Sequence, residues 1–171
     1  SFIGRATELR RIGDLLGQDD CRLLTLLGPG GVGKSRLAGQ VIREFGQRFA
    51  DGAAFIPLED ISSSSELGGR LARELGVGLA GSEEPLVQVL EFLRQRRVLL
   101  VLDNFEHLAT DASILDRLVK TCAGLKIIAT SRVRLAVSSE WLFPLEGLPC
   151  PEIEDEDRFD AFDAVRAEAI A

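Results

Sequence analysis

Methionine is absent from this sequence of 171 residues, and histidine and cysteine are scarce. The single histidine is His107, and the three cysteines, Cys21, Cys122 and Cys150, lie far apart. Their odd number and wide spacing argue against a structural zinc site and indicate buried or incidental thiols in a reduced compartment. Because the chain begins at Ser1 and has no methionine, we expect it to be an excerpt from a longer polypeptide.

Long hydrophobic runs are lacking as well. The longest apolar run, residues 98–102, has the length of a strand, whereas a membrane-spanning helix needs about 20 apolar residues. No signal-peptide pattern opens the chain. We therefore expect no membrane contact and a cytoplasmic location.

The chain also lacks a basic stripe. Its net charge is -7, and residues 152–171 carry eight acidic and two basic side chains. The rest of the chain is therefore close to neutral. A nucleic-acid-binding domain normally shows clustered lysine and arginine, so we expect no direct nucleic-acid binding by this domain.

Short apolar runs alternate with stretches of helical periodicity, which is typical of an α/β protein with a parallel sheet between helices. The predicted strands are residues 23–27, 53–58, 98–103, 126–130 and 141–145. Residues 1–150 have the length of one domain. The acidic start and helical pattern of residues 151–171 indicate a linker and the start of a following helical module.

The most informative motif is a glycine-rich loop between the first predicted strand and the next helix. It consists of Gly28, Pro29, Gly30, Gly31, Val32, Gly33, Lys34 and Ser35, and it matches G-x-x-x-x-G-K-[S/T] at every fixed position. Such a loop directs backbone N–H groups and a helix N-terminus at phosphate oxygens. Lys34 would contact the β- and γ-phosphates, and Ser35 would bind Mg²⁺. The motif predicts a site for Mg-ATP or Mg-ADP; the alternative is a glycine-rich turn that binds nothing.

Asp103 ends the third predicted strand and would lie at the carboxyl edge of the sheet, where open α/β folds bind ligands. A carboxylate there is suited to hold Mg²⁺; the alternative is an ordinary aspartate that starts a turn. The next residue, Asn104, can orient a water molecule but cannot take its proton. Glu106 is the first candidate for a general base and His107 the alternative. We therefore expect slow hydrolysis of ATP.

A further strand end carries Thr130, Ser131 and Arg132. If this strand lies beside the strand that ends in Asp103, Arg132 reaches toward the γ-phosphate, where a planar cation distinguishes ATP from ADP. The alternative is a solvated surface arginine. Thr130 and Ser131 are expected to shape the turn.

Four motifs occur in order: Phe-Ile-Gly-Arg-x-x-Glu in residues 2–8, the loop motif in residues 26–38, Leu-Leu-Val-Leu-Asp-Asn-Phe-Glu-His-Leu in residues 99–108, and Ile-Ile-Ala-Thr-Ser-Arg in residues 127–132. Together they resemble the STAND class of signal-transduction ATPases, specifically its NB-ARC-like ATPase domains. The nearest likeness is to those of bacterial SARP- and LuxR-type transcriptional regulators. The resemblance covers about residues 1–150.

The resemblance implies a P-loop NTPase three-layer αβα sandwich with a five-stranded parallel sheet in order 5-1-4-3-2. It also implies an adenine pocket lined near Phe2, Ile3, Gly4 and Arg5, with Asp103 as the Mg²⁺ ligand and Arg132 as the γ-phosphate sensor. The cofactor-binding residues that it adds to the loop are Phe2, Ile3, Gly4, Arg5 and Arg36.

Members of this class use the nucleotide as a switch, resting with ADP and assembling with ATP. The resemblance therefore implies downstream helical and winged-helix modules as partners, and nucleotide-dependent self-association of the full protein. Asn104 departs from the second acid common in the class, and residues 147–150 match its Gly-Leu-Pro-Leu motif only in part and too early. Two other functions stay open: a P-loop kinase acting on a small acceptor, although no arginine-rich lid is evident, and a non-hydrolysing interaction module.

Overall fold

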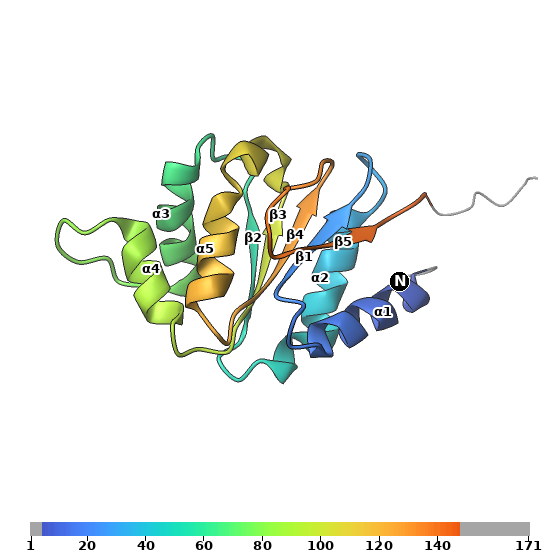
Figure 1. Cartoon of the computed structure of the whole chain (residues 1–171), viewed down its shortest axis with the longest axis horizontal. Helices are drawn as coiled ribbons and strands as arrows, with labels where there is room; N and C mark the ends of the chain where they lie inside the picture. The colour runs from blue at the N-terminus through green and yellow to red at the C-terminus, as the bar shows by residue number, and fades with distance from the viewer. Residues whose placement is uncertain (1–4, 148–171) are drawn as a thin grey trace, which may run out of the picture.

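Strands and helices alternate, except at α3–α4 (residues 64–93) and β4–β5 (residues 126–144), through residues 5–147, the part of the chain that the computed structural model describes (Figure 1). The strands are β1 (Leu23–Leu27), β2 (Ala53–Pro57), β3 (Leu99–Asp103), β4 (Lys126–Ser131) and β5 (Glu140–Pro144). The helices are α1 (Ala6–Gly17), α2 (Lys34–Phe45), α3 (Ser64–Leu75), α4 (Pro85–Leu93) and α5 (Ser113–Thr121), with two short 3₁₀ helices, η1 (Gly46–Arg48) and η2 (Phe105–Asp111). Each predicted strand is found, with its ends within one residue of the prediction.

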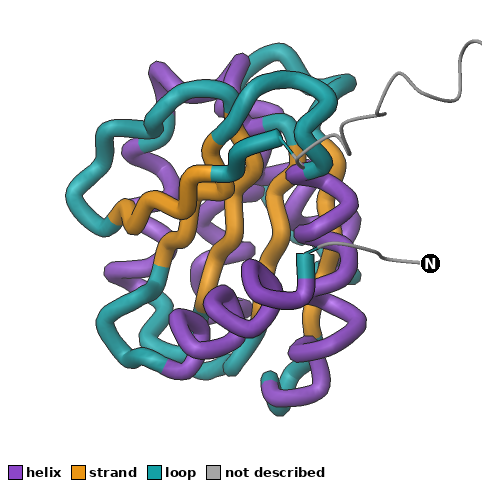
Figure 2. The backbone as a smooth tube through the Cα atoms, turned by 90° about the vertical axis from the view of Figure 1, so that its right-hand side faces the viewer, coloured by secondary structure: helices purple, strands orange, loops and turns teal. Residues whose placement is uncertain are grey.

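The five strands form one parallel sheet in the order β2-β3-β4-β1-β5. This is the predicted order 5-1-4-3-2 read from the other side, so the predicted fold is confirmed. Figure 2 shows the strands side by side with helices in front of and behind them. Because all strands run the same way, the residues that follow β1, β3 and β4 lie at one edge of the sheet.

The central strands are buried on both faces, so successive side chains enter opposite halves of the core. Leu23 packs into the cluster that includes α3, α4 and α5, whereas Leu24 packs into the cluster that includes α1 and α2. Figure 1 shows these two helical layers on either side of the sheet. Continuous apolar strands and amphipathic helices thus account for the three layers.

Helices α3 and α4 approach each other closely at Gly68. A Cβ atom at Gly68 would lie 2.6 Å from the backbone nitrogen of Leu86, closer than such atoms approach in proteins. At the neighbouring Gly69, no atom lies within 4 Å of the corresponding position. The packing of α4 on α3 therefore requires a residue without a Cβ atom at Gly68, whereas Gly69 has no such constraint.

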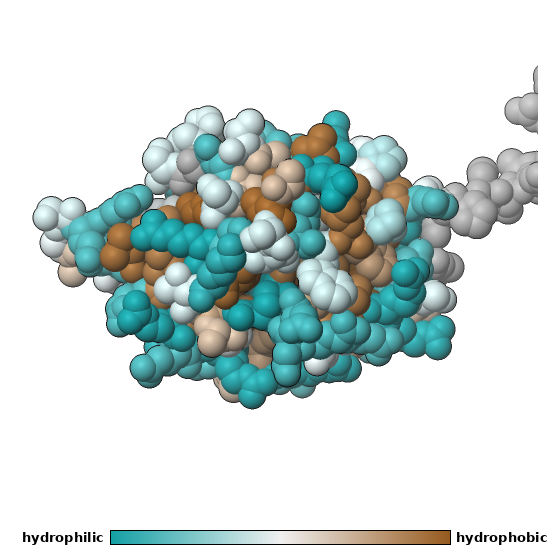
Figure 3. All heavy atoms as spheres, in the orientation of Figure 1, coloured by the Kyte–Doolittle hydropathy of each residue, from teal (hydrophilic) through white to brown (hydrophobic). Residues whose placement is uncertain are grey.

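The outer surface is largely hydrophilic on the face drawn in Figure 3, where smaller hydrophobic areas interrupt it. The exposed large hydrophobic side chains of residues 5–147 are Phe55, Leu79, Val133, Trp141 and Leu142. None of the helices in this range is long and apolar enough to cross a membrane.

Cys21 and Cys122 are buried and unpaired, as predicted for buried thiols. Burial raises the pKa of both thiols above the usual range. A raised pKa lowers the thiolate fraction and with it the reactivity of the sulfur. The third cysteine, Cys150, lies outside the described residues.

Candidate functional site

A pocket of about 270 Å³ lies at the carboxyl edge of the sheet; we call it the loop pocket. Its lining residues are Gly30, Gly31, Gly33, Lys34, Ser35, Arg36, Asn104 and Arg132. Six of them come from the predicted phosphate loop and the start of α2, and the other two follow β3 and β4. The fold therefore gathers three segments that were predicted separately.

The glycine-rich loop makes a tight turn from β1 into α2. Gly33, the residue directly before α2, has a φ of 92°, in the left-handed region that glycine adopts at low cost. Gly28 is crowded, because a Cβ there would lie 2.7 Å from the carbonyl oxygen of Leu145. No side chain of the described residues caps the N-terminus of α2. The first-turn N–H groups, which have no partners within a helix, stay available to an anion.

Lys34 is buried, with 7% of its surface exposed, and its ammonium group lies across the loop. Its Nζ atom donates hydrogen bonds of 2.7 Å and 2.9 Å to the carbonyl oxygens of Gly28 and Pro29. Burial lowers the pKa of Lys34, an effect that the carboxylates of Glu106 and Asp103 partly oppose. The loop thus holds a cation whose charge is only partly compensated. Ser35, the next residue, is exposed at the pocket.

Asp103 ends β3 as a buried carboxylate with 7% of its surface exposed. The hydroxyl of Thr130, on the neighbouring strand β4, donates a 2.6 Å hydrogen bond to Oδ1 of Asp103. The same hydroxyl accepts a 2.9 Å hydrogen bond from the backbone N–H of Asn104. Thr130 was predicted only to shape a turn, and its bond to Asp103 was not predicted. The sequence did contain a signal for this bond, namely a threonine at the end of the strand expected to lie beside the strand that ends in Asp103.

Asn104 follows β3 with φ 62° and ψ 49°, a left-handed conformation that asparagine tolerates better than most residues. Its Nδ2 atom lies 3.4 Å from Oε2 of Glu59, which follows β2. Glu59 is exposed and was not among the predicted site residues. The structure therefore brings another carboxylate to the amide at position 104.

Arg132 reaches the loop pocket as predicted and forms an ion pair that was not predicted. Its Nε atom lies 3.1 Å from Oε1 of Glu106, whose side chain is only 23% exposed. The other oxygen, Oε2, is buried without a hydrogen-bond partner among the described residues. The guanidinium group of Arg132 therefore occupies one oxygen of Glu106, the first candidate for a general base. His107, the alternative base, is exposed and does not line the loop pocket.

Arg5 is the one member of the predicted adenine pocket that the structure describes. It is buried, and its guanidinium group donates hydrogen bonds of 2.9 Å to the carbonyl oxygen of Val32 and 2.7 Å to that of Glu146. It thereby ties the phosphate loop to the segment after β5. The other predicted members, Phe2, Ile3 and Gly4, lie outside the described residues.

Comparison with known proteins gives a family and several multidomain relatives. A profile of the AAA domain family matches residues 18–135. An uncharacterized protein of Mycobacterium tuberculosis is 34% identical over 157 residues, which cover 90% of this chain and 39% of that protein. A protein of the same organism described as an HTH-type transcriptional regulator is 37% identical over 133 residues, 76% of this chain and 15% of its own length. Regulatory protein AfsR of Streptomyces griseus is 28% identical over 145 residues, 78% of this chain and 14% of its own length. The chain thus spans less than half of each relative.

Two solved structures share the fold. Cdc6p from Pyrobaculum aerophilum matches with a TM-score of 0.65 and 19% identity, over 85% of this chain and 46% of that chain. A STAND protein with a tetratricopeptide repeat sensor from Pyrococcus horikoshii matches with a TM-score of 0.51 and 18% identity, over 85% of this chain and 23% of that chain. At these identities the likeness shows the fold alone, which is the predicted P-loop NTPase fold.

Proposed function

We propose that this chain, which belongs to the AAA domain family of P-loop ATPases, is the ATP- and ADP-binding switch of a multidomain regulator and hydrolyses ATP slowly. The observation that carries the proposal is the loop pocket, where the phosphate loop meets the residues after β3 and β4. Lys34, Asn104 and Arg132 all line it.

A phosphate chain fits the chemistry of the loop pocket. The first turn of α2 offers backbone N–H groups that no side chain of the described residues caps. Lys34 adds a fixed cation that no carboxylate of the described residues contacts. In the proposal, Lys34 binds the β- and γ-phosphates, and Arg132 distinguishes ATP from ADP by binding the γ-phosphate.

Mg²⁺ would be held by the Ser35 hydroxyl and the Asp103 carboxylate. Both are oxygen ligands, which Mg²⁺ prefers, and phosphate oxygens and water complete such sites. Thr130 occupies only Oδ1 of Asp103, so the second carboxylate oxygen is the one assigned to the metal or its water. The ion would neutralise charge on the phosphates.

The slow hydrolysis in the proposal follows from two residues that come after Asp103, namely Asn104 and Glu106. Asn104 cannot accept a proton, and Glu106 is already paired with Arg132 at 3.1 Å. If Arg132 moves to a γ-phosphate, Glu106 loses its partner while Oε2 stays buried. We therefore keep Glu106 as the proposed base. Its release from Arg132 depends on the nucleotide.

The proposal includes the narrower assignment to the NB-ARC-like domains of the STAND class. The four ordered motifs support it, as do regulatory proteins among the relatives. By this assignment the partners are the nucleotide, downstream helical and winged-helix modules of the same chain, and other copies of the full protein. We assign no nucleic-acid binding to this domain.

Calorimetric titration with Mg-ADP and Mg-ATP tests the proposal. Wild-type protein should bind both, and Lys34→Ala should weaken binding by at least about tenfold, because charge-assisted hydrogen bonds to phosphate are lost. The control is Lys120→Ala, which removes a lysine whose side chain is 61% exposed and paired with Asp116. Equal affinity of Lys34→Ala and wild type would remove the site assignment. Transfer of phosphate to a small acceptor faster than its release to water would favour a kinase instead.

A further inference from the structure

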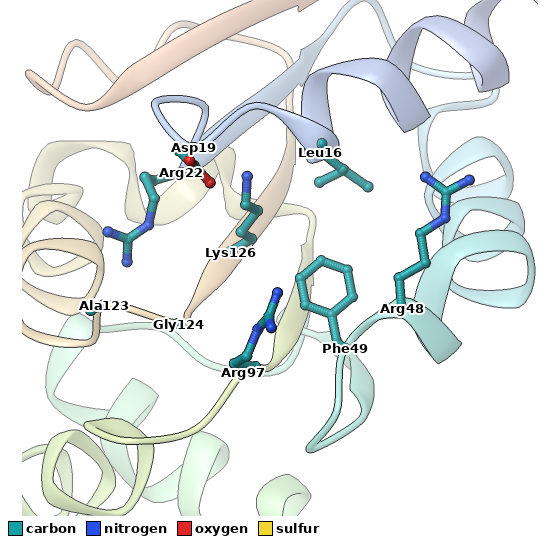
Figure 4. Close-up of a pocket in the computed structure, with 10 residues that line it drawn as sticks. Leu16, Asp19, Arg22, Arg48, Phe49, Arg97, Ala123, Gly124 and Lys126 are labelled. Atoms are coloured by element: carbon teal, nitrogen blue, oxygen red, sulfur yellow. The ribbon is translucent and has the colours of Figure 1, made fainter.

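A second pocket, of about 410 Å³, lies at the opposite edge of the sheet, where the strands begin (Figure 4); we call it the basic pocket. Its lining residues are Leu16, Gly17, Asp19, Arg22, Arg48, Phe49, Arg97, Ala123, Gly124 and Lys126. They come from the end of α1 and from the segments that lead into β1, β2, β3 and β4. None of them lines the loop pocket, so this site is separate from the proposed nucleotide site.

The charge of the basic pocket is opposite to that of the chain. Four of its lining residues are basic and one, Asp19, is acidic, in a chain of net charge -7. Within residues 5–147, none of these four cations forms a salt bridge with a carboxylate. A cavity that gathers cations without paired acids attracts anions.

Arg22 has a structural task. Its Nε atom donates a 3.0 Å hydrogen bond to the carbonyl oxygen of Leu125, and its Nη2 atom donates to that of Cys122. Figure 4 shows its guanidinium group turned away from the centre of the pocket. Arg22 therefore holds the end of α5 and contributes only its charge to the pocket.

Lys126 is half-buried and retains part of its donor capacity. Its Nζ atom donates a 3.1 Å hydrogen bond to the carbonyl oxygen of Cys21 and another bond to that of Gln18. An ammonium group has three hydrogens, so one is left for a further acceptor. Burial lowers the pKa of Lys126, and the neighbouring Cys21 and Asp19 oppose this effect.

Arg97 is exposed and has unused donors. Its backbone is fixed by Asp51, whose carboxylate accepts a 2.8 Å hydrogen bond from the Arg97 N–H and whose own N–H donates to the Arg97 carbonyl oxygen at 3.1 Å. Its guanidinium group makes no hydrogen bond or salt bridge that the structure shows within residues 5–147. Figure 4 shows this side chain extending from its loop toward Lys126.

The remaining wall of the pocket is apolar. Leu16 is 7% exposed, and Figure 4 shows the half-buried ring of Phe49 facing the same space as the Arg97 side chain. A pocket lined by both an aromatic ring and a guanidinium group suits a ligand that is apolar at one end and charged at the other. The volume also falls in the range of roughly 300–1,000 Å³ that small-molecule pockets occupy.

We propose that the basic pocket binds a small organic anion, whose phosphate or carboxylate group is held by Arg97 and Lys126 and whose apolar body packs on Phe49. The hollow form favours a small molecule over nucleic acid, which binds an extended basic surface. The proposal does not depend on nucleotide binding in the loop pocket.

Two aromatic anions, 1-naphthyl phosphate and 1-naphthoate, test the proposal when each is titrated into the ¹⁵N-labelled chain by NMR. Saturable shifts are expected at the backbone amides of Phe49, Arg97 and Gly124 with at least one anion. The anion that binds more tightly identifies the preferred charged group. Arg97→Gln should raise the Kd of that anion by about tenfold, because charge-assisted hydrogen bonds are lost. Arg94→Gln is the matched control, because Arg94 is exposed and does not line the pocket.

Four results would overturn the proposal. These are the absence of shifts at millimolar concentrations of both anions, shifts confined to the loop amides of Gly31 and Gly33, equal Kd values for the Arg97→Gln and Arg94→Gln variants, and equal binding of neutral 1-naphthol. A short DNA duplex is titrated as well. If the duplex shifts the amides of the basic pocket and neither naphthyl anion does, the ligand is nucleic acid and not a small molecule.

Discussion

The hydroxyl of Thr130 donates a 2.6 Å hydrogen bond to Oδ1 of Asp103 and thereby joins the ends of β4 and β3. Because the same oxygen accepts the N–H of Asn104, the hydroxyl hydrogen is directed at the carboxylate. Thr130 is fully buried, so water does not compete for these bonds. The pair fixes the orientation of the carboxylate that we propose as the Mg²⁺ ligand.

Thr130→Val should weaken Mg-ATP binding by roughly threefold to tenfold and lower the free energy of unfolding by about 1–3 kcal/mol. The reason is that the Asn104 N–H and the Asp103 carboxylate each lose a buried partner. Thr130→Ser keeps the hydroxyl and is the control. Titrations with and without Mg²⁺, together with urea unfolding, measure both effects. Identical Mg-ATP affinities of the Val and Ser variants would contradict the assigned role of Thr130.

Arg132→Ala should weaken ATP binding by about tenfold and leave the ADP affinity unchanged within about twofold, because only ATP presents the γ-phosphate to this side chain. Arg134→Ala, which removes an exposed arginine outside the loop pocket, is the control. Calorimetry with each nucleotide gives the ratio of the two affinities. Parallel losses for ATP and ADP would make Arg132 a structural residue.

Asn104→Asp should accelerate ATP hydrolysis by at least about tenfold, since general bases typically contribute more than this. Aspartate tolerates the left-handed backbone at this position, where φ is 62°. Asn104→Gly accepts the same backbone without supplying a base and should show no acceleration. Phosphate release at saturating Mg-ATP is the measurement. Unchanged rates in the Asp variant would mean that turnover is limited elsewhere, for example by the Glu106–Arg132 pair.

Gly68→Ala should lower the free energy of unfolding by about 1–3 kcal/mol, because the added Cβ forces α3 and α4 apart. Gly69→Ala, at the next position of the same helix, should be neutral or stabilising by up to about 1 kcal/mol, since alanine favours the helix over glycine. Urea unfolding of both variants checks the difference. Similar destabilisation by the two substitutions would show that α4 does not pack closely at Gly68.

Asp116 should make stability depend on pH. Burial acts to raise its pKa, but hydrogen bonds from Ser138, Lys120 and Ser139 outweigh burial and hold the pKa far below its usual value. The folded state therefore takes up a proton at Asp116 less readily than the unfolded state. Its stabilisation is complete above about pH 4 and is lost as the pH falls toward the folded-state pKa.

Asp116→Asn should accordingly cost about 1–3 kcal/mol at neutral pH and progressively less below about pH 4. Chemical denaturation of wild type and variant across this range measures the difference. The exposed Asp111 provides the control as Asp111→Asn. A difference between wild type and Asp116→Asn that stays constant with pH would contradict the mechanism.

The sheet and the phosphate loop could be predicted because their signals are local. β3 is buried at every position, so it appears in the sequence as an unbroken apolar run that ends in Asp103. Gly28 to Ser35 match a motif in which each fixed residue has a physical task. The order of the strands came from the family resemblance, since periodicity alone does not specify which strands are neighbours.

The contacts within the site were less predictable, because they depend on the pairing of distant segments. The Thr130–Asp103 bond requires β4 to lie beside β3, and the Arg132–Glu106 pair requires the loop after β4 to meet η2. The basic pocket carries no motif, because its lining comes from five separate segments. Arg97, for example, cannot be distinguished from Arg94 and Arg96 in the sequence.

Strand β1 connects the two pockets, since Arg22 directly precedes it and the phosphate loop begins at Gly28. Its five residues, at roughly 3.3 Å each, give β1 a length of about 17 Å from one edge of the sheet to the other. Charges in contact with solvent are screened over about 8 Å at physiological ionic strength. Over this length the repulsion between anions bound at the two edges is largely screened. β3 and β4 also run from one pocket to the other, so a mechanical coupling between the two sites has three adjacent strands of the sheet available to it.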